Sequence, residues 1–221
     1  MYGVTLLNDK LYVLRVREFD HTTWFGFDIY STKNSTWQLE HMVTVAGQDL
    51  TDVASCAVHQ CLYVCDFGAK SVMKLGLDGE VVGSWSVDEA PVGISVMPHT
   101  DSCRLLITSS ESNTLLQLDC DSGQCSRFVS LPDEVRSPRH AILLPGGEVL
   151  VSHGEPNAHR VRKVSTRGDI IHSFGDEVDS LNLPCQVRTF LTVCLVGHAP
   201  HLWKKLHCPT SVPGLPTKNV T

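Results

Sequence analysis

Nine cysteines and eleven histidines are the residues of this 221-residue chain that could perform metal or redox chemistry. Cys56, Cys61 and Cys65 are separated by four and three residues, and Cys120 and Cys125 by four. None of these spacings is the two-residue spacing typical of zinc ribbons. Most of these thiols fall within apolar strand patterns, where a free cysteine behaves as a small buried hydrophobe. We therefore expect structural thiols, with no metal site and no cofactor.

Positive charge is concentrated between residues 136 and 172, where six lysines and arginines face three acidic residues. Residues 49–88 have the reverse composition, with six acidic residues and two lysines. A local basic surface could contact the phosphates of RNA. The whole chain carries a net charge of −6, which opposes general nucleic-acid affinity. A mixed-charge surface exposed to solvent is therefore favoured over RNA binding.

The elements that must position these residues come from a repeat. An apolar triplet recurs every 43 to 51 residues, and its copies begin at Leu11, Leu62, Leu105 and Val149. Turns follow the last three triplets, with glycines 44 and 45 residues apart at Gly79, Gly123 and Gly168. Repeats of this length with several short strands indicate a β-propeller, in which one repeat is one four-stranded blade.

The sequence thus predicts an all-β fold with one propeller domain over residues 1–187. A blade cannot bury both of its faces alone and must stack on its neighbours. Blades are expected at about residues 3–45, 50–88, 91–135 and 138–175, with a fifth beginning at 183. Residues 188–221 lack both the triplet and the turn, so we expect an irregular or aberrant C-terminal tail there. A family-specific extension is the alternative.

Four complete blades allow two architectures. Propellers have about four to eight blades, so four blades either close on themselves or form part of a larger ring. A ring that stays open leaves exposed sheet edges. We favour part of a six-bladed ring, of which this chain would contain about four blades.

Several segments resemble NHL repeats. Residues 91–96 and 138–143 read PVGISV and PRHAIL, which is similar to the Pro-x-Gly-Ile-Ala-Val entry strand of these repeats. Residues 64–72, VCDFGAKSV, resemble the middle of a repeat, and residues 173–175 resemble the Phe-Gly end of a blade. The resemblance covers about residues 3–187 and is specific for the repeat class rather than for one member.

This resemblance implies an interaction platform. NHL-type propellers are mostly binding modules, as in TRIM-like ubiquitin ligases, and some bind RNA on a basic face. A minority are enzymes, such as a lyase that holds a metal with histidines around the central channel. The sequence shows no RING, B-box or coiled-coil segment, so any ligase activity would lie outside it.

A channel metal site of the lyase type needs about three ligands that converge on one point. His140 occupies the position that Gly93 has in the preceding repeat, and it is therefore expected near the channel mouth. The matching positions in other repeats hold Ala54 and Gln186, so only one repeat supplies a histidine. His153 is expected to be a loop residue rather than a ligand.

The favoured function is a non-enzymatic protein-interaction module related to TRIM-like proteins, because loops on a rigid scaffold commonly carry binding residues. RNA binding through the basic surface of the fourth blade is the first alternative. A metal-dependent lyase or hydrolase is the second, for which the sequence offers Asp66 and His140. The candidate contact residues, all expected near loops of the fourth blade, are Arg136, Arg139, His140, His153, Glu155, Asn157, His159 and Arg160.

The expected location is the cytoplasm. No stretch approaches the roughly 20 apolar residues of a membrane span, and no N-terminal leader pattern is visible. An odd number of cysteines fits a reducing compartment, whereas Cys120 and Cys125 would form a disulfide only in a secreted protein. We expect a protein partner, no membrane contact and no small-molecule substrate.

Overall fold

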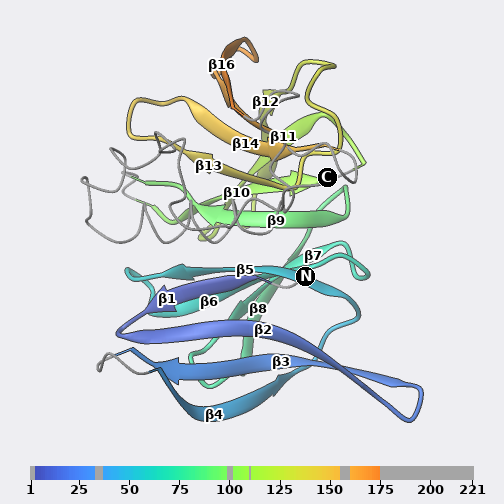
Figure 1. The fold of residues 1–221 in the computed structure, drawn as a ribbon, viewed down its shortest axis with the longest axis vertical. Coiled ribbons are helices and arrows are strands. Elements are labelled where there is room, and N and C mark those ends of the chain that lie inside the picture. Colours follow the sequence, from blue (N-terminus) through green and yellow to red (C-terminus); the bar gives the residue numbers. More distant parts are fainter. Residues whose placement is uncertain (1–2, 33–36, 99–101, 110, 155–159, 175–221) are drawn as a thin grey trace, which may run out of the picture.

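The structure, a computed structural model, describes residues 3–32, 37–98, 102–109, 111–154 and 160–174. Every regular element in these ranges is a β-strand, and the strands form four antiparallel sheets of four (Figure 1). The predicted all-β fold of four-stranded blades is therefore confirmed. The described residues contain no helix that could cross a membrane. The expected fifth blade and C-terminal tail lie outside the described residues.

Each of the first two sheets is a simple meander, in which strands that follow each other in the chain are neighbours. The first sheet consists of β1 (Val4–Leu7), β2 (Lys10–Phe19), β3 (Thr22–Ser31) and β4 (Gln38–Val45). The second consists of β5 (Leu50–Cys56), β6 (Cys61–Asp66), β7 (Ser71–Leu75) and β8 (Val81–Ser86).

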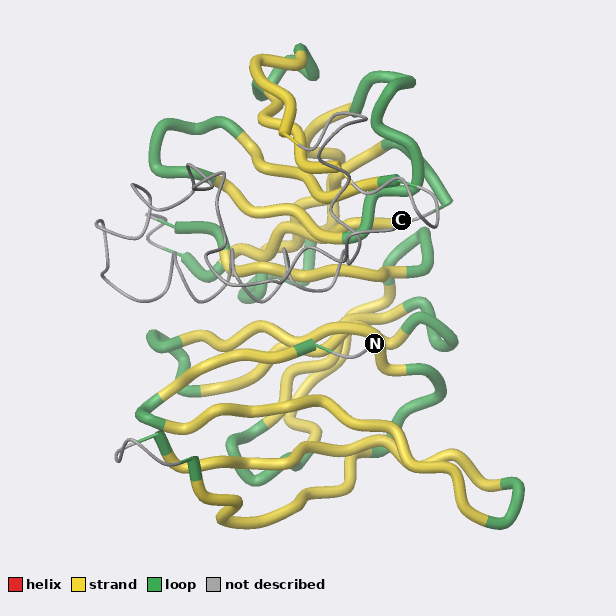
Figure 2. The backbone as a smooth tube through the Cα atoms, viewed as in Figure 1, coloured by secondary structure: helices red, strands yellow, loops and turns green. Residues whose placement is uncertain are grey.

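The other two sheets repeat the same meander. The third consists of β9 (Pro91–Val96), β10 (Arg104–Ser109), β11 (Thr114–Asp119) and β12 (Cys125–Ser130). The fourth consists of β13 (His140–Leu143), β14 (Val149–His153), β15 (Arg160–Val164) and β16 (Ile170–Phe174). The tube in Figure 2 shows the hairpins that join these strands.

Burial along the strands follows their place in the stack. All six residues of β6 are buried, because this strand lies inside a sheet that has a neighbour on each face. The outermost strand of the same sheet, β8, is only half-buried or exposed along its length. Strands that are apolar on both faces therefore belong to the interior, as packing between two sheets requires.

Three apolar layers fill the spaces between successive sheets. Phe27 and Leu62 belong to the first layer, between the first and second sheets. Tyr63 and Leu105 belong to the second layer, and Leu106 and Val149 to the third. Each sheet therefore stabilises the next, because its apolar side chains leave water only when a neighbour covers them.

Turns that contain glycine pack each of the last three sheets against the sheet before it. In the second, third and fourth sheets, the turn between the last two strands rests on the outermost strand of the preceding sheet. A Cβ atom at any of these glycines would lie less than 3.0 Å from that strand, and all three have positive φ. The contacting pairs are Gly79 with Val43, Gly123 with Trp85, and Gly168 with Ser130.

The four sheets form an arc. Figure 1 shows β1–β4 at one end of the molecule and β13–β16 at the other. Among the described residues, the first and fourth sheets share no apolar cluster, whereas successive sheets do. The described blades thus correspond to an incomplete propeller.

We expect Gly168→Ala to destabilise the protein more than Gly147→Ala does. Both glycines lie in the fourth sheet with φ of 94° and 88°, so both substitutions force alanine into the left-handed region at about 1–2 kcal/mol. A Cβ at Gly147 has nothing within 4 Å, whereas at Gly168 it meets the Ser130 carbonyl oxygen. That overlap should cost about 1–3 kcal/mol more. Urea unfolding measures the difference, and equal losses would contradict the proposed contact.

Candidate functional site

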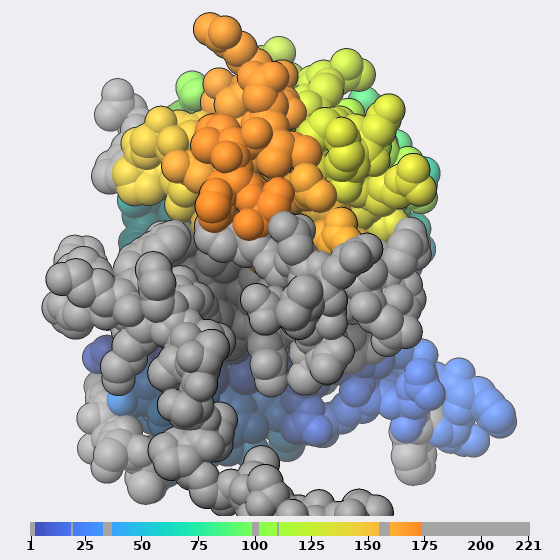
Figure 3. Space-filling model, turned by 45° about the horizontal axis from the view of Figure 1, so that its top comes forward, coloured from blue at the N-terminus to red at the C-terminus, as the bar shows by residue number. Residues whose placement is uncertain are grey.

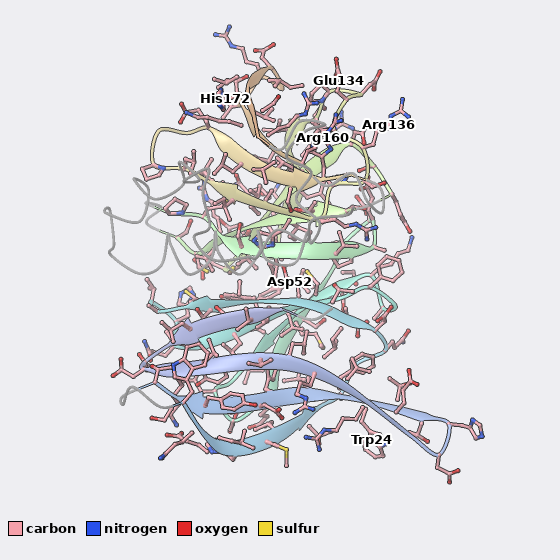
Figure 4. All side chains as sticks on the ribbon, in the orientation of Figure 1. Trp24, Asp52, Glu134, Arg136, Arg160 and His172 are labelled. Atoms are coloured by element: carbon pink, nitrogen blue, oxygen red, sulfur yellow. The ribbon has the colours of Figure 1, made fainter. Side chains whose placement is uncertain are left out.

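The structure separates the eight candidate contact residues into three groups. Arg136 and Arg139 are exposed in the segment before β13, and half-buried Arg160 begins β15. Figure 4 shows Arg136 and Arg160 at the same end of the fourth sheet. Glu155, Asn157 and His159 lie outside the described residues.

The two histidines of the set are strand residues in the interior, not loop residues. His140 begins β13 and His153 ends β14, and each is only 4% exposed. The expected loop positions were therefore wrong: β14 extends two residues beyond the apolar triplet at Val149–Val151 to include His153, and β13 begins at His140. Neither side chain can contact a partner without leaving its buried position.

His140 is part of a buried polar contact that joins three sheets. Its Nδ1 lies 2.9 Å from Oδ2 of Asp52, and both side chains are almost fully buried. The same carboxylate oxygen accepts the backbone N–H of Ile94 at 3.0 Å. Asp52 lies on β5, Ile94 on β9 and His140 on β13, which places the contact at the inner strands (Figure 4).

Close packing of the inner strands surrounds this contact. A Cβ at Gly93 would overlap the carbonyl oxygen of Arg139, so glycine is required where β9 meets β13. Ser95 donates its hydroxyl to the carbonyl of Ala141 at 2.7 Å, and Thr51 donates to the carbonyl of Pro91 at 3.1 Å. Side chains thus satisfy backbone groups that strands of separate sheets cannot pair directly.

The residues that a lyase would use have separate partners. Both carboxylate oxygens of Asp66 accept backbone N–H groups, from Gln48, Asp49 and Ala69, at 2.9 to 3.0 Å. His140 contacts Asp52 instead, and its Nε2 is buried without a hydrogen-bond partner among the described residues. In the described part, one histidine and one carboxylate meet near the inner strands. This is fewer than the three ligands of a catalytic metal site.

A second polar cluster, which the sequence did not predict, lies in the apolar layer between the second and third sheets. Sγ of Cys103 lies 3.6 Å from Sγ of Cys56 and 3.3 Å from Sγ of Cys120. Cys61 faces Cys56 across the β5–β6 hairpin and is hydrogen-bonded to it. The hydrogen bond with Cys103 lowers the pKa of Cys56 and that of Cys120. The hydrogen bond with Cys120 raises the pKa of Cys103, and burial adds to this.

Two further side chains complete the cluster. The Tyr63 hydroxyl lies 3.4 Å from Sγ of Cys103 and 3.3 Å from Nδ1 of His59. We call Cys56, Cys61, Cys103, Cys120, His59 and Tyr63 together the thiol–histidine cluster. Spacing rules could not reveal it, because Cys56 and Cys103 are 47 residues apart, Cys56 at the end of β5 and Cys103 just before β10 of the next sheet. Aligning the repeats, which places neighbouring hairpins side by side, is the signal that could have found it.

His153 is held in its neutral form. Burial is the main cause that lowers its pKa to about 4, and the nearby charges of Arg162 and Arg160 lower it further. A hydrogen bond with the backbone of Arg136 opposes this shift. Nε2 of His153 accepts from Nε of Arg162 at 3.2 Å, which requires an unprotonated nitrogen.

Solved β-propellers share this fold. The hydrazine synthase of Kuenenia stuttgartiensis matches 77% of this chain and 47% of its own, with TM-score 0.55 and 18% identity. Virginiamycin B lyase of Staphylococcus aureus matches 78% of this chain and 54% of its own, with TM-score 0.52 and 14% identity. The Cps50 (Swd1) β-propeller domain of Myceliophteria thermophila matches 78% and 56%, with TM-score 0.52 and 14% identity.

The chain therefore spans about half the length of these propellers. No family model matches the sequence, and no curated protein matches it either. At such low identities the likeness establishes the β-propeller fold, and this fold is known for both enzymes and binding modules.

We expect Asp52→Ala to lower the free energy of unfolding by about 2–4 kcal/mol, because it leaves the buried Ile94 N–H and His140 without an acceptor. Asp52→Asn keeps one acceptor oxygen and should cost less. Asp133→Ala, at an exposed position, serves as the control. Urea unfolding measures all three, and an unchanged midpoint for Asp52→Ala would show that the contact contributes nothing.

We expect stability to fall between pH 6.5 and 4 because of His153. Its folded pKa of about 4 lies below its ordinary value of 6.5, so the unfolded chain binds the proton first. The stabilisation is present above pH 6.5 and is lost as the pH falls to 4, by roughly 3 kcal/mol at most. His153→Gln should flatten this part of the curve in urea titrations at several pH values. His172→Gln, at an exposed position, should leave it unchanged.

Proposed function

We propose that this protein is a non-enzymatic protein-interaction module built from NHL-type blades of a TRIM-like propeller. The entry-strand likeness supports the class, because PVGISV coincides with β9 and is placed against the next inner strand. The observation that carries the function is an exposed apolar and cationic surface on the first sheet. We define the outer face as the side of the first sheet that points away from the second.

Exposed apolar side chains concentrate on the first sheet. Trp24, Leu39 and Met42 are 52%, 49% and 55% exposed, and Trp37 just before β4 is 64% exposed. These four make up half of the large exposed hydrophobic residues in the described part. The β2–β3 hairpin projects from the body of the molecule, and Trp24 lies near its base (Figures 3 and 4). Tryptophan and methionine are enriched at protein interfaces.

The charge of the outer face indicates which kind of partner it could bind. Arg15 and Arg17 line a shallow hollow with Trp24 and Met42, and Asp28 lies at its base. Both arginines pair with the buried Asp28, Arg17 at 3.5 Å, while their side chains stay about half exposed. Two guanidinium groups share one carboxylate, so one positive charge is left over. A peptide or loop with an acidic side chain beside an apolar one has the complementary chemistry.

The exposed arginines of the fourth blade support a second candidate. Arg136 and Arg139 are exposed, and Arg136 lies at the same end of the fourth sheet as Arg160 (Figure 4), so these arginines are the basic residues that RNA binding would use. Together with the undescribed Glu155, Asn157 and His159, they stay a proposed contact set for a protein or an RNA. RNA binding there predicts an affinity that falls steeply with salt.

A displayed random-peptide library, selected on the full chain, tests the interaction function. We expect selected peptides to combine acidic and apolar residues. Trp24→Ala and Arg17→Ala should each weaken a selected peptide about 10-fold or more in fluorescence polarisation, as interface anchors do. Val58→Ala is the control, because Val58 is 85% exposed in the turn between β5 and β6 of the second sheet.

Three results would contradict this assignment. Selected peptides that lack the acidic and apolar combination, and that bind Trp24→Ala as tightly as the unaltered chain, would show that the outer face is not the binding surface. A dimer in solution that Trp24→Ala dissociates would show that a second copy covers this face. Salt-sensitive binding of a poly(U) probe that is lost in Arg136→Ala and Arg139→Ala would favour RNA.

A further inference from the structure

We propose that Cys56, His59 and Cys103 bind a zinc ion between the second and third sheets, with Cys120 as the fourth ligand. This site is separate from the outer face and does not depend on the interaction function. It would be a structural site, because its ligands come from two blades that it would join.

The donor atoms already lie close together. The ligand atoms of Cys56, His59 and Cys103 all lie within 4.8 Å of one another. In a tetrahedral zinc site with Zn–S bonds of about 2.3 Å, the sulfurs are about 3.8 Å apart. The observed Sγ–Sγ distances are 3.6 Å for Cys56 with Cys103 and 3.3 Å for Cys103 with Cys120. Cys120 Sγ lies beside Cys103 but outside the group of three donor atoms, so its side chain would have to rotate to become the fourth ligand.

The ligand types select the metal. Thiolates with one imidazole suit zinc, whereas calcium and magnesium require oxygen ligands. Three cysteines and one histidine are a common set for structural zinc. Ligands supplied by a hairpin and by a neighbouring sheet explain why the usual short spacing is absent from the sequence.

The surroundings of the site are those of a structural metal centre. Cys56 and Cys103 are 3% and 8% exposed within the second apolar layer, which keeps water from competing for the metal. His59 is half-buried at the margin of this layer and provides a path for entry. The backbone N–H of Cys120 donates to the carbonyl of Cys103 at 3.0 Å, which fixes these two residues relative to each other.

Tyr63 supplies an outer contact to the ligands. Its hydroxyl lies 3.3 Å from Nδ1 of His59 and 3.4 Å from Sγ of Cys103, so it contacts two of the proposed ligands. Such contacts from outside the coordination sphere orient metal ligands. Tyr63 is fully buried on β6, so it fixes the orientation of the ring.

Two other states of this cluster make different predictions. The thiols could be apolar core residues without a ligand, or the close pair Cys103 and Cys120 could be oxidised to a disulfide. In neither state does His59 bind a metal. His59 is also the residue whose replacement perturbs the apolar layer least, because it is half-buried rather than buried.

The test uses the full chain, purified under reducing conditions and titrated with zinc or cobalt alone. We expect one zinc ion per chain by native mass spectrometry. Cobalt should give thiolate charge-transfer and tetrahedral d–d absorption. Zinc at about 100 times its Kd should raise Tm by roughly 5–10 °C. His59→Ala should weaken binding by more than about 10-fold, and Tyr63→Phe by about 10-fold.

His41→Ala and Cys125→Ala are the matched controls, because both residues lie outside the cluster and neither is buried. Both should bind zinc as the unaltered chain does. Zinc affinity that is unchanged in His59→Ala would overturn the site, as would a reduced chain that binds no zinc. A Cys103–Cys120 disulfide in mass spectra of the reduced preparation would also overturn it. Peptide binding at Trp24 should persist in His59→Ala, so failure of either proposal can be recognised separately.

Discussion

The carboxylate of Asp52 connects the inner strands of three successive sheets. It belongs to β5, accepts the Ile94 N–H of β9 and lies against Nδ1 of His140 on β13. A buried carboxylate is tolerated only when hydrogen bonds replace its hydration, so β9 and β13 cannot shift without exposing an unsatisfied charge. At the rim, the turn glycines fit each sheet onto the outermost strand of the one before. The sheets are thus held at both their inner and outer edges, and the apolar layers fill the space between.

The fold could be predicted because its signals are local. The side chains of the triplet at Leu62 point alternately to the two faces of the second sheet, and both faces are buried. An apolar run of this kind can be recognised in the sequence without knowing which residues it contacts. Gly79, Gly123 and Gly168 each lie in the last hairpin of a blade, because a Cβ atom there would overlap the preceding sheet. Trp85 on β8 is half-buried and packs against the second apolar layer, with its ring centroid 6.1 Å from that of Tyr63.

The sites could not be predicted in the same way, because they depend on which sheets meet. Asp52 and His140 are 88 residues apart and contact each other past an intervening blade. The thiols form a cluster because the β5–β6 hairpin lies against the ends of β10 and β11. Trp24 precedes buried Phe25 on β3, and Met42 lies on β4, which is exposed over most of its length. Their exposure reflects both the outer position of β4 in its sheet and the position of that sheet at the end of the arc.

The two ends of the arc differ in what could cover them. The far side of the fourth sheet carries a small apolar cluster of Ile142, Leu150 and Val161, each less than 9% exposed. The outer face of the first sheet instead holds two half-exposed arginines around one buried carboxylate. A further sheet packed onto this face would remove water from two guanidinium groups that share one carboxylate. A ligand that brings its own carboxylate would balance the remaining positive charge, and this supports the proposal that the outer face binds a partner.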